Sequence, residues 1–86
     1  MERDERWEAL FKLVQGAVAD QFGVHPDRVS TGRSILETFS ADSLDVLQIV
    51  IRLEDLLQVE IPEEDTPCFL TVRDATEYLY SKGVMA

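Results

Sequence analysis

The chain has 86 residues, 45% of them hydrophobic, and this length and composition predict one small domain over residues 1–86. Its net charge of −9, with no cluster of Lys or Arg, excludes the counterion displacement on which nucleic-acid binding depends. The sequence has no apolar run near the roughly 20 residues that span a bilayer, and the charged start MERDERWEAL has no secretory signal core. With one cysteine, Cys68, there is no internal disulfide, so we expect a cytoplasmic protein that binds no membrane.

The first half of the chain predicts one helix followed by a long connection. Residues 4–22 carry apolar side chains at intervals of three and four, which share one helix face: Trp7, Leu10, Phe11, Val14, Val18 and Phe22. Gly23 then supplies a stop. From 23 to 41 the period is lost, but scattered apolar residues indicate a packed connection in which HPDRV forms a short helical turn.

The second half predicts three more helices. Residues 42–58 form the most buried one, with inward residues Leu44, Val46, Leu47, Val50, Ile51, Leu53 and Leu57. Pro62 opens a short third helix over 62–66, which Pro67 ends. Thr71, with Asp74 three residues later, caps a fourth helix that buries Val72, Ala75, Tyr78 and Leu79 and ends at Gly83. The predicted fold class is all-α, a small four-helix bundle of three main helices and one short third helix.

Side chains that could support catalysis are scarce, so the sequence predicts no enzyme. His25 lies in the long connection and is expected to be an exposed turn residue, while Cys68 is expected to be a small core residue. The sequence contains no Gly-rich phosphate loop, no H-E-x-x-H and no EF-hand spacing. We therefore predict no catalytic residues and no metal ligands.

The acidic residues are unevenly distributed. Between residues 37 and 65 nine acids stand against one base, Arg52, which gives this segment a net charge of −8; the acids are Glu37, Asp42, Asp45, Glu54, Asp55, Glu60, Glu63, Glu64 and Asp65. Such a surface keeps a protein soluble, and it can also steer the protein onto basic partners. Both interpretations stay open on composition alone.

Ser43, in the stretch SADSLD, has an unusual setting. With Asp42 as the N-cap, Ser43 occupies the first helical position, where its side chain projects into solvent. Its hydroxyl then lies beside the unpaired N–H groups and the positive end of the helix dipole, which favour a phosphate ester. This argument permits either phosphorylation or phosphopantetheinylation of Ser43.

Four ordered blocks of this sequence resemble the acyl carrier proteins, over roughly residues 7–80. A-D-S-L-D is similar to their 4′-phosphopantetheine attachment motif, and it is followed by an apolar helix and L-E-D-L-L-Q-V-E-I-P-E-E-D. I-P-E-E-D resembles the start of their third helix, and T-V-R-D-A-T-E-Y-L resembles their fourth. F-G-V-H-P-D-R-V is similar to the end of their first helix and the loop after it.

The resemblance implies a monomeric carrier rather than a catalyst. Ser43 would receive 4′-phosphopantetheine from coenzyme A through a Mg²⁺-dependent phosphopantetheinyl transferase. The arm's thiol would then carry acyl thioesters between acyl-transferring, ketosynthase-type or adenylating enzymes of fatty acid or polyketide-type biosynthesis. We expect an apolar acyl pocket lined by Val46, Val50, Leu53, Ile61 and Leu79. We expect basic patches of partner enzymes to dock on Asp42, Asp45, Gln48, Arg52, Glu54, Asp55 and Glu60.

Three residues depart from the family pattern. Ser40 stands where the family usually has Gly, Gln48 replaces a commonly acidic residue, and Arg52 adds a cation. Positions 45, 48, 52 and 55 share a stripe of the helix surface, so the acidic stripe is diluted, which favours a dedicated pathway over general fatty acid synthesis. The segment from Pro67 to Leu70 is also more apolar than usual, and neutral drift is the alternative explanation for each departure. The alternative functions are an aminoacyl or peptidyl carrier and an unmodified acidic interaction module.

Overall fold

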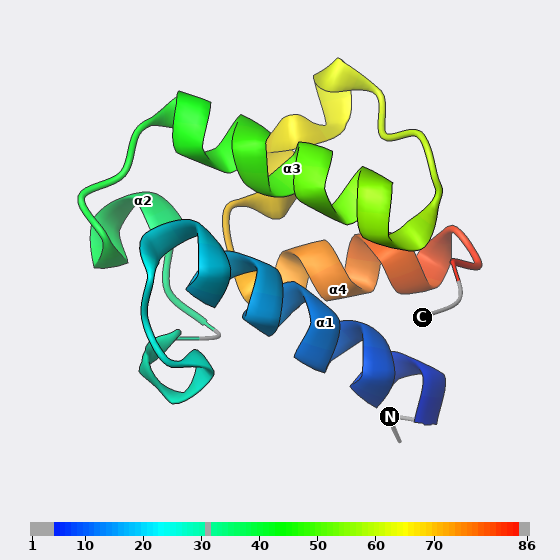
Figure 1. The fold of residues 1–86 in the computed structure, drawn as a ribbon. Helices are drawn as coiled ribbons and strands as arrows, with labels where there is room; N and C mark the ends of the chain where they lie inside the picture. The colour runs from blue at the N-terminus through cyan, green and yellow to red at the C-terminus, as the bar shows by residue number, and fades with distance from the viewer. Residues whose placement is uncertain (1–4, 31, 85–86) are drawn as a thin grey trace.

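The computed structural model describes residues 5–30 and 32–84, and its regular structure is helical throughout (Figure 1). The elements in chain order are α1 (Glu5–Phe22), the 3₁₀ turn η1 (Pro26–Arg28), α2 (Ile35–Thr38), α3 (Ser43–Leu57), the 3₁₀ helix η2 (Glu63–Phe69) and α4 (Val72–Ser81). The all-α prediction is confirmed. Over the described ranges, every helix is too short or too polar to cross a membrane.

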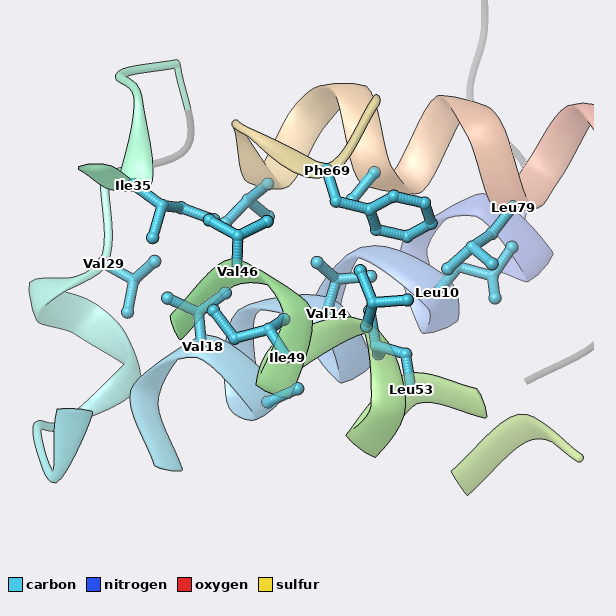
Figure 2. Packing of buried hydrophobic residues seen from close by; sticks show 14 of the residues in the cluster. Leu10, Val14, Val18, Val29, Ile35, Val46, Ile49, Leu53, Phe69 and Leu79 are labelled. Atoms are coloured by element: carbon cyan, nitrogen blue, oxygen red, sulfur yellow. The ribbon is translucent and has the colours of Figure 1, made fainter. Parts of the chain in front are cut away.

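The three long helices form the body of the bundle. α1 packs most extensively against α4, and α3 packs against both α1 and η2 (Figure 1). The start of α1 is tied to the end of α4, because Arg6 Nη1 donates to the Val84 carbonyl at 2.9 Å and its Nη2 donates to the Tyr80 carbonyl at 3.2 Å. Side chains from all three helices therefore share one core, part of which Figure 2 shows.

Helix α1 follows its predicted amphipathic pattern. Four of its predicted inward residues are buried, and Phe11 and Phe22 are half-buried against the core. Phe22 stacks on Phe39, with ring centroids 4.3 Å apart, and so attaches the end of α1 to the connection that follows. Gly23 ends the helix as predicted, with a φ of 64° that suits glycine.

The connection from 23 to 41 contains the predicted turn and one helix that was not predicted. In η1, His25 is exposed and its Nδ1 accepts from the Asp27 N–H at 3.1 Å. The short helix α2 is fixed by contacts with a distant segment, because Ile35 is buried and its N–H donates to the Leu70 carbonyl at 2.7 Å. Four residues carry too little periodicity to reveal such a helix in sequence.

Helix α3 buries one face rather than most of its circumference. Its buried residues are Val46, Ile49, Val50 and Leu53, so Ile49 is a core residue that was not among the predicted inward residues. The predicted burial of Leu44 and Ile51 was wrong, since their exposed fractions are 59% and 53%. Leu47 and Leu57 are half-buried. The reason is geometric: Leu44 and Ile51 lie two turns apart on the face opposite the core.

The third helix differs from its prediction in type and length. Instead of ending before Pro67, η2 continues through it to Phe69, because the fixed φ of proline is compatible with a 3₁₀ turn. Phe69 is fully buried, and its ring centroid lies 5.0 Å from that of Tyr78. Cys68 is exposed, so its prediction as a core residue was wrong. The neighbouring residue Phe69 is buried in the core instead.

Helix α4 begins and ends where its sequence indicates. The Thr71 hydroxyl oxygen accepts from the Asp74 N–H at 3.0 Å, which confirms the predicted cap. Val72, Ala75 and Leu79 are buried as predicted, while Tyr78 is half-buried. The Thr76 hydroxyl is also buried and donates to the Val72 carbonyl at 2.8 Å. The chain turns away at Gly83, whose φ is 76°.

Candidate functional site

Ser43 is the first residue of α3, and its side chain is exposed. The residue before it, Asp42, is the N-cap, and its Oδ1 accepts from the Asp45 N–H at 3.1 Å. In return Asp45 Oδ2 accepts from the Asp42 N–H at 3.2 Å, which completes a capping box. The two carboxylates therefore fix the start of the helix, and the Ser43 hydroxyl is not used as the cap.

Ser40 sits in a turn with a left-handed backbone. Its φ is +52°, in the region that glycine adopts freely and residues with a Cβ adopt at a cost. After this turn the Ala41 N–H donates to the Leu36 carbonyl at 3.0 Å, and the chain then enters the α3 cap. Ser40 thus occupies a position whose geometry favours glycine, which is the residue that the resemblance leads one to expect.

A surface groove of about 340 Å³ begins at Ser43 and runs between α3 and η2. Its other lining residues are Leu44, Leu47, Glu63 and Thr66. Two leucines make its surface mostly apolar, and Glu63 supplies an exposed carboxylate. Sequence reasoning identified Ser43 but not this groove, because the approach of η2 to α3 depends on the path of the loop between them.

The predicted stripe on α3 is solvent-exposed along most of its length. Gln48, Arg52 and Asp55 are exposed, and Asp45 is half-buried. The Arg52 Nη1 lies 4.0 Å from Asp20 Oδ2 of α1, in an exposed pair that contributes little to stability.

The same surface of α3 carries exposed apolar residues that were not predicted to lie there. Leu44, Ile51 and Leu56 are all more than half exposed, at 59%, 53% and 58%. Leu44 and Ile51 lie on the same stripe as Gln48, at intervals of four and three residues. The outer face of α3 therefore carries a mixture of apolar, neutral, acidic and basic groups rather than a uniform acidic strip.

Two predicted docking acids also make bonds within the chain. Glu54 is half-buried, and its Oε2 accepts from the Ile61 N–H at 2.8 Å. Asp45 Oδ1 accepts from Gln21 Nε2 at 3.3 Å, in addition to its role in the cap. Glu60 is exposed. Of the predicted docking acids, Asp42, Asp55 and Glu60 are thus exposed, whereas Asp45 and Glu54 are partly enclosed.

The five predicted pocket residues are all buried in the core. Figure 2 shows Val46, Leu53 and Leu79 among the packed side chains. Only Ile61 and Leu79 of the five reach a cavity, of about 350 Å³, that opens between the α3–η2 loop and the end of α4. The structure thus brings two of the five to an open space and keeps three within the packed interior.

Tyr78 and Asp65 close one side of this cavity. The Tyr78 hydroxyl donates to Asp65 Oδ2 at 2.6 Å, which links α4 to η2. This hydrogen bond, with burial and the negative charge of Asp65, raises the pKa of Tyr78 to about 12. The Tyr78 hydroxyl therefore keeps its proton and its hydrogen bond to Asp65 at neutral pH.

The remaining reactive side chains stand apart from Ser43. Cys68 is an exposed free thiol, and His25 lies 3.6 Å from Asp27 in an exposed pair. Residues 5–30 and 32–84 contain no group of three or more His, Cys, Asp or Glu side chains that could hold a metal ion. What the fold and the site define is a carrier domain: a small helical bundle that presents one serine hydroxyl at a helix start.

Comparison with known proteins agrees with this class. Residues 12–79 match the model of a protein family described as a phosphopantetheine attachment site. The chain is 37% identical over 75 residues to an acyl carrier protein of Bdellovibrio bacteriovorus, covering 87% of this chain and 96% of that protein. It is 34% identical over 70 residues to an acyl carrier protein of Clostridium perfringens, covering 81% and 92%. The solved structure of an acyl carrier protein from Enterococcus faecalis matches with a TM-score of 0.70 and 31% identity, covering 87% and 95%.

The chain belongs to the acyl carrier protein family. It is therefore an acyl carrier that bears a covalently attached 4′-phosphopantetheine. Members of this family are carriers rather than catalysts, and they interact with a phosphopantetheinyl transferase and with biosynthetic enzymes.

Proposed function

We propose that Ser43 Oγ is the attachment point of the phosphopantetheine arm. The observation that carries this proposal is the exposed Ser43 hydroxyl at the first position of α3, next to a cap made by two other side chains. In the loading step Oγ loses its proton and bonds to the pantetheine-side phosphorus of coenzyme A. The bond from that phosphorus to the departing adenosine bisphosphate breaks.

The residues around Ser43 fit such an arm. The N–H groups of the first turn of α3 and the positive end of its dipole favour the phosphodiester. The groove beside it offers Leu44 and Leu47 for the apolar parts of the arm and the Thr66 side chain for its polar parts. When bound, the group supplies a thiol that holds the acyl cargo as a thioester.

We propose further that the core opens to shelter part of the acyl chain. Its lining would be Val46, Val50, Leu53, Ile61 and Leu79, which are buried apolar residues in one cluster. Ile61 and Leu79 also line the cavity of about 350 Å³, so an opening there would extend an existing space. Burial of each cargo methylene would contribute about 0.8 kcal/mol.

The docking surface in this proposal comprises the outer face of α3, its N-cap and the loop that follows the helix. Its exposed acids Asp42, Asp55 and Glu60 would meet basic patches on acyl-transferring, ketosynthase-type or adenylating enzymes. Asp45 and Glu54 would add negative charge beneath them, although both also bond within the chain. Because Gln48 and Arg52 dilute this charge, we assign the protein to a dedicated fatty acid or polyketide-type pathway. It would act as a monomer, and its exposed free Cys68 suits the reducing cytoplasm.

Intact-mass measurement tests the attachment site. Co-expression with a broad-specificity phosphopantetheinyl transferase should add the mass of one phosphopantetheine, and Ser43→Ala should abolish the addition. Ser40→Gly, which changes the other serine of SADSLD, should load as completely as the wild type. An unshifted wild-type mass with several such transferases would favour an unmodified interaction module. Loading of Ser43→Ala would show that the arm is attached elsewhere.

A further inference from the structure

The Thr66 hydroxyl is a buried polar group that no other part of the described chain satisfies. Thr66 lies on η2 and lines the groove that begins at Ser43. Its Oγ1 is buried and, among the described residues, is the one buried side-chain oxygen or nitrogen without a hydrogen-bond partner. An unpaired buried hydroxyl destabilises a fold, so a group that pairs with it when the carrier is loaded would offset that loss.

The buried Thr76 shows how a threonine hydroxyl in this fold can be satisfied within its own helix. Thr76 is fully buried on α4, and its hydroxyl donates to the Val72 carbonyl one turn earlier, at 2.8 Å. Thr66 has no such bond. Its Oγ1 is buried, but the residue also lines the groove, so a rotation of the side chain would bring the hydroxyl to a partner there. Because a threonine hydroxyl in this fold can be satisfied within its own helix, as at Thr76, the unpaired hydroxyl of Thr66 points to a ligand in the groove.

The groove otherwise contains no side-chain donor suited to an amide carbonyl. Leu44 and Leu47 are apolar, and an ionised Glu63 can only accept. Ser43 loses its O–H when it is esterified. Thr66 is then the one lining side chain able to donate, and a pantetheine arm contains two amide groups with carbonyl acceptors.

We propose that the Thr66 hydroxyl donates a hydrogen bond to an amide carbonyl of the pantetheine arm and so positions the arm along the α3–η2 groove. This inference rests on the proposed attachment at Ser43. Because Oγ1 is buried in the structure, this bond requires a change of χ1 to another staggered rotamer that brings the hydroxyl to the groove surface. Thr66 is a positioning residue: it does not take part in loading or in thioester chemistry.

The test compares apo and holo forms of the wild type and Thr66→Val, which keeps the shape of the side chain and removes the donor. Apo Thr66→Val should be at least as stable as the apo wild type, because the unpaired hydroxyl is gone. The rise in Tm on loading should be clear in the wild type and largely lost in Thr66→Val. Thr66→Ser, which restores a hydroxyl, should recover it. The ¹³C chemical shift of the labelled arm's amide carbonyl should differ between the wild type and Thr66→Val, because a carbonyl that accepts a hydrogen bond is deshielded.

Thr76→Val is the matched control. It removes a satisfied buried hydroxyl, so it should lower the Tm of apo and holo forms equally. Equal loading-induced changes in the wild type and Thr66→Val would overturn the inference. A dependence on Thr66 that appears only after acylation would also overturn it, since the partner would then be the cargo carbonyl. Intact mass confirms loading in every sample, and loading of Ser43→Ala shows separately whether the arm is attached elsewhere.

Discussion

Asp42 and Asp45 exchange hydrogen bonds across the first turn of α3, with each carboxylate accepting from the other residue's N–H at 3.1 and 3.2 Å. These acids flank Ser43 in SADSLD, where acidic residues could be read as docking surface alone. The exchange shows that they also hold the helix start in place. Because both side chains of the cap come from its neighbours, Ser43 needs no structural role of its own.

The first prediction tests whether Asp42, rather than Ser43, stabilises the start of α3. Asp42→Ala should lower the free energy of unfolding by about 1 kcal/mol, because it removes the acceptor for the Asp45 N–H. Ser43→Ala should change it by less than about 0.5 kcal/mol, since its side chain is exposed and makes no cap. Urea denaturation of the apo proteins measures both. If Ser43→Ala costs as much as Asp42→Ala, the serine hydroxyl contributes to the cap after all.

The second prediction concerns the left-handed backbone at Ser40. With φ at +52°, Ser40→Gly should raise the free energy of unfolding by about 1 kcal/mol, because glycine adopts this conformation without steric cost. Ser34→Gly is the control, since the φ of Ser34 is −59° and glycine has no advantage there. Thermal unfolding should show a higher Tm for the first variant only. A lower Tm for Ser40→Gly would mean that the Ser40 side chain stabilises the turn.

The third prediction follows from the bond between Glu54 Oε2 and the Ile61 N–H. Glu54→Ala should lower the free energy of unfolding by about 1–2 kcal/mol, because a partly enclosed N–H loses its acceptor. Glu54→Gln keeps an acceptor oxygen and should cost less. Asp55→Ala, at the exposed neighbouring acid, should stay within about 0.5 kcal/mol of the wild type. Unchanged stability in Glu54→Ala would leave Glu54 with a docking role only.

The fourth prediction is a pH dependence from Tyr78. Its folded pKa of about 12 lies above the ordinary value of 10.0, mainly because of the hydrogen bond to Asp65. The stability that this bond contributes is therefore fully present below pH 10 and is lost as the pH rises toward about 12. Tyr78→Phe should remove this alkaline loss.

Phenolate absorbance checks the assignment. In a Tyr80→Phe background Tyr78 is the remaining one of the two tyrosines, so its titration can be followed alone. Adding Asp65→Asn should lower the apparent pKa toward its ordinary value. A titration that Asp65→Asn leaves unchanged would show that Asp65 is not the cause of the raised pKa.

Features set by neighbouring residues could be predicted from the sequence. The extents of α1, α3 and α4 follow from apolar spacing and from caps at Asp42 and Thr71, which act within one turn. The exposed Ser43 at the first position of α3 follows from the same local rules. The position of Ser40 differed from the family pattern, but its positive φ is set by the turn between α2 and α3 and could not be predicted from the sequence.

Features set by distant contacts could not be predicted. Helix α2 depends on the bond from Ile35 to Leu70, and the burial of Phe69 in place of Cys68 depends on how η2 meets α4. Which side of α3 faces the core decides that Leu44 is exposed, and an apolar pattern over most of the helix circumference does not specify this. The unpaired Thr66 hydroxyl likewise reflects the whole set of its neighbours.

The last prediction concerns partner choice, for which Arg52 is the most informative residue. It is the one base among nine acids between residues 37 and 65, and it is exposed on α3. Its pairing with Asp20 at 4.0 Å is weak, so Arg52→Glu should leave the fold intact. Toward general fatty acid enzymes with basic docking patches, the holo variant should show a kcat/KM raised by roughly threefold to tenfold at low salt, because rim charges govern the rate of encounter.

Arg73→Glu makes the same change of net charge on α4 and serves as the control, since Arg73 is exposed away from the α3 stripe. It should give little gain, and the advantage of Arg52→Glu should shrink as salt is added, because exposed charges are screened. Equal gains from both variants would mean that total charge, rather than the stripe, controls encounter. No gain from Arg52→Glu would mean that Arg52 does not select partners, and the exposed pair Leu44 and Ile51 would become the next residues to substitute.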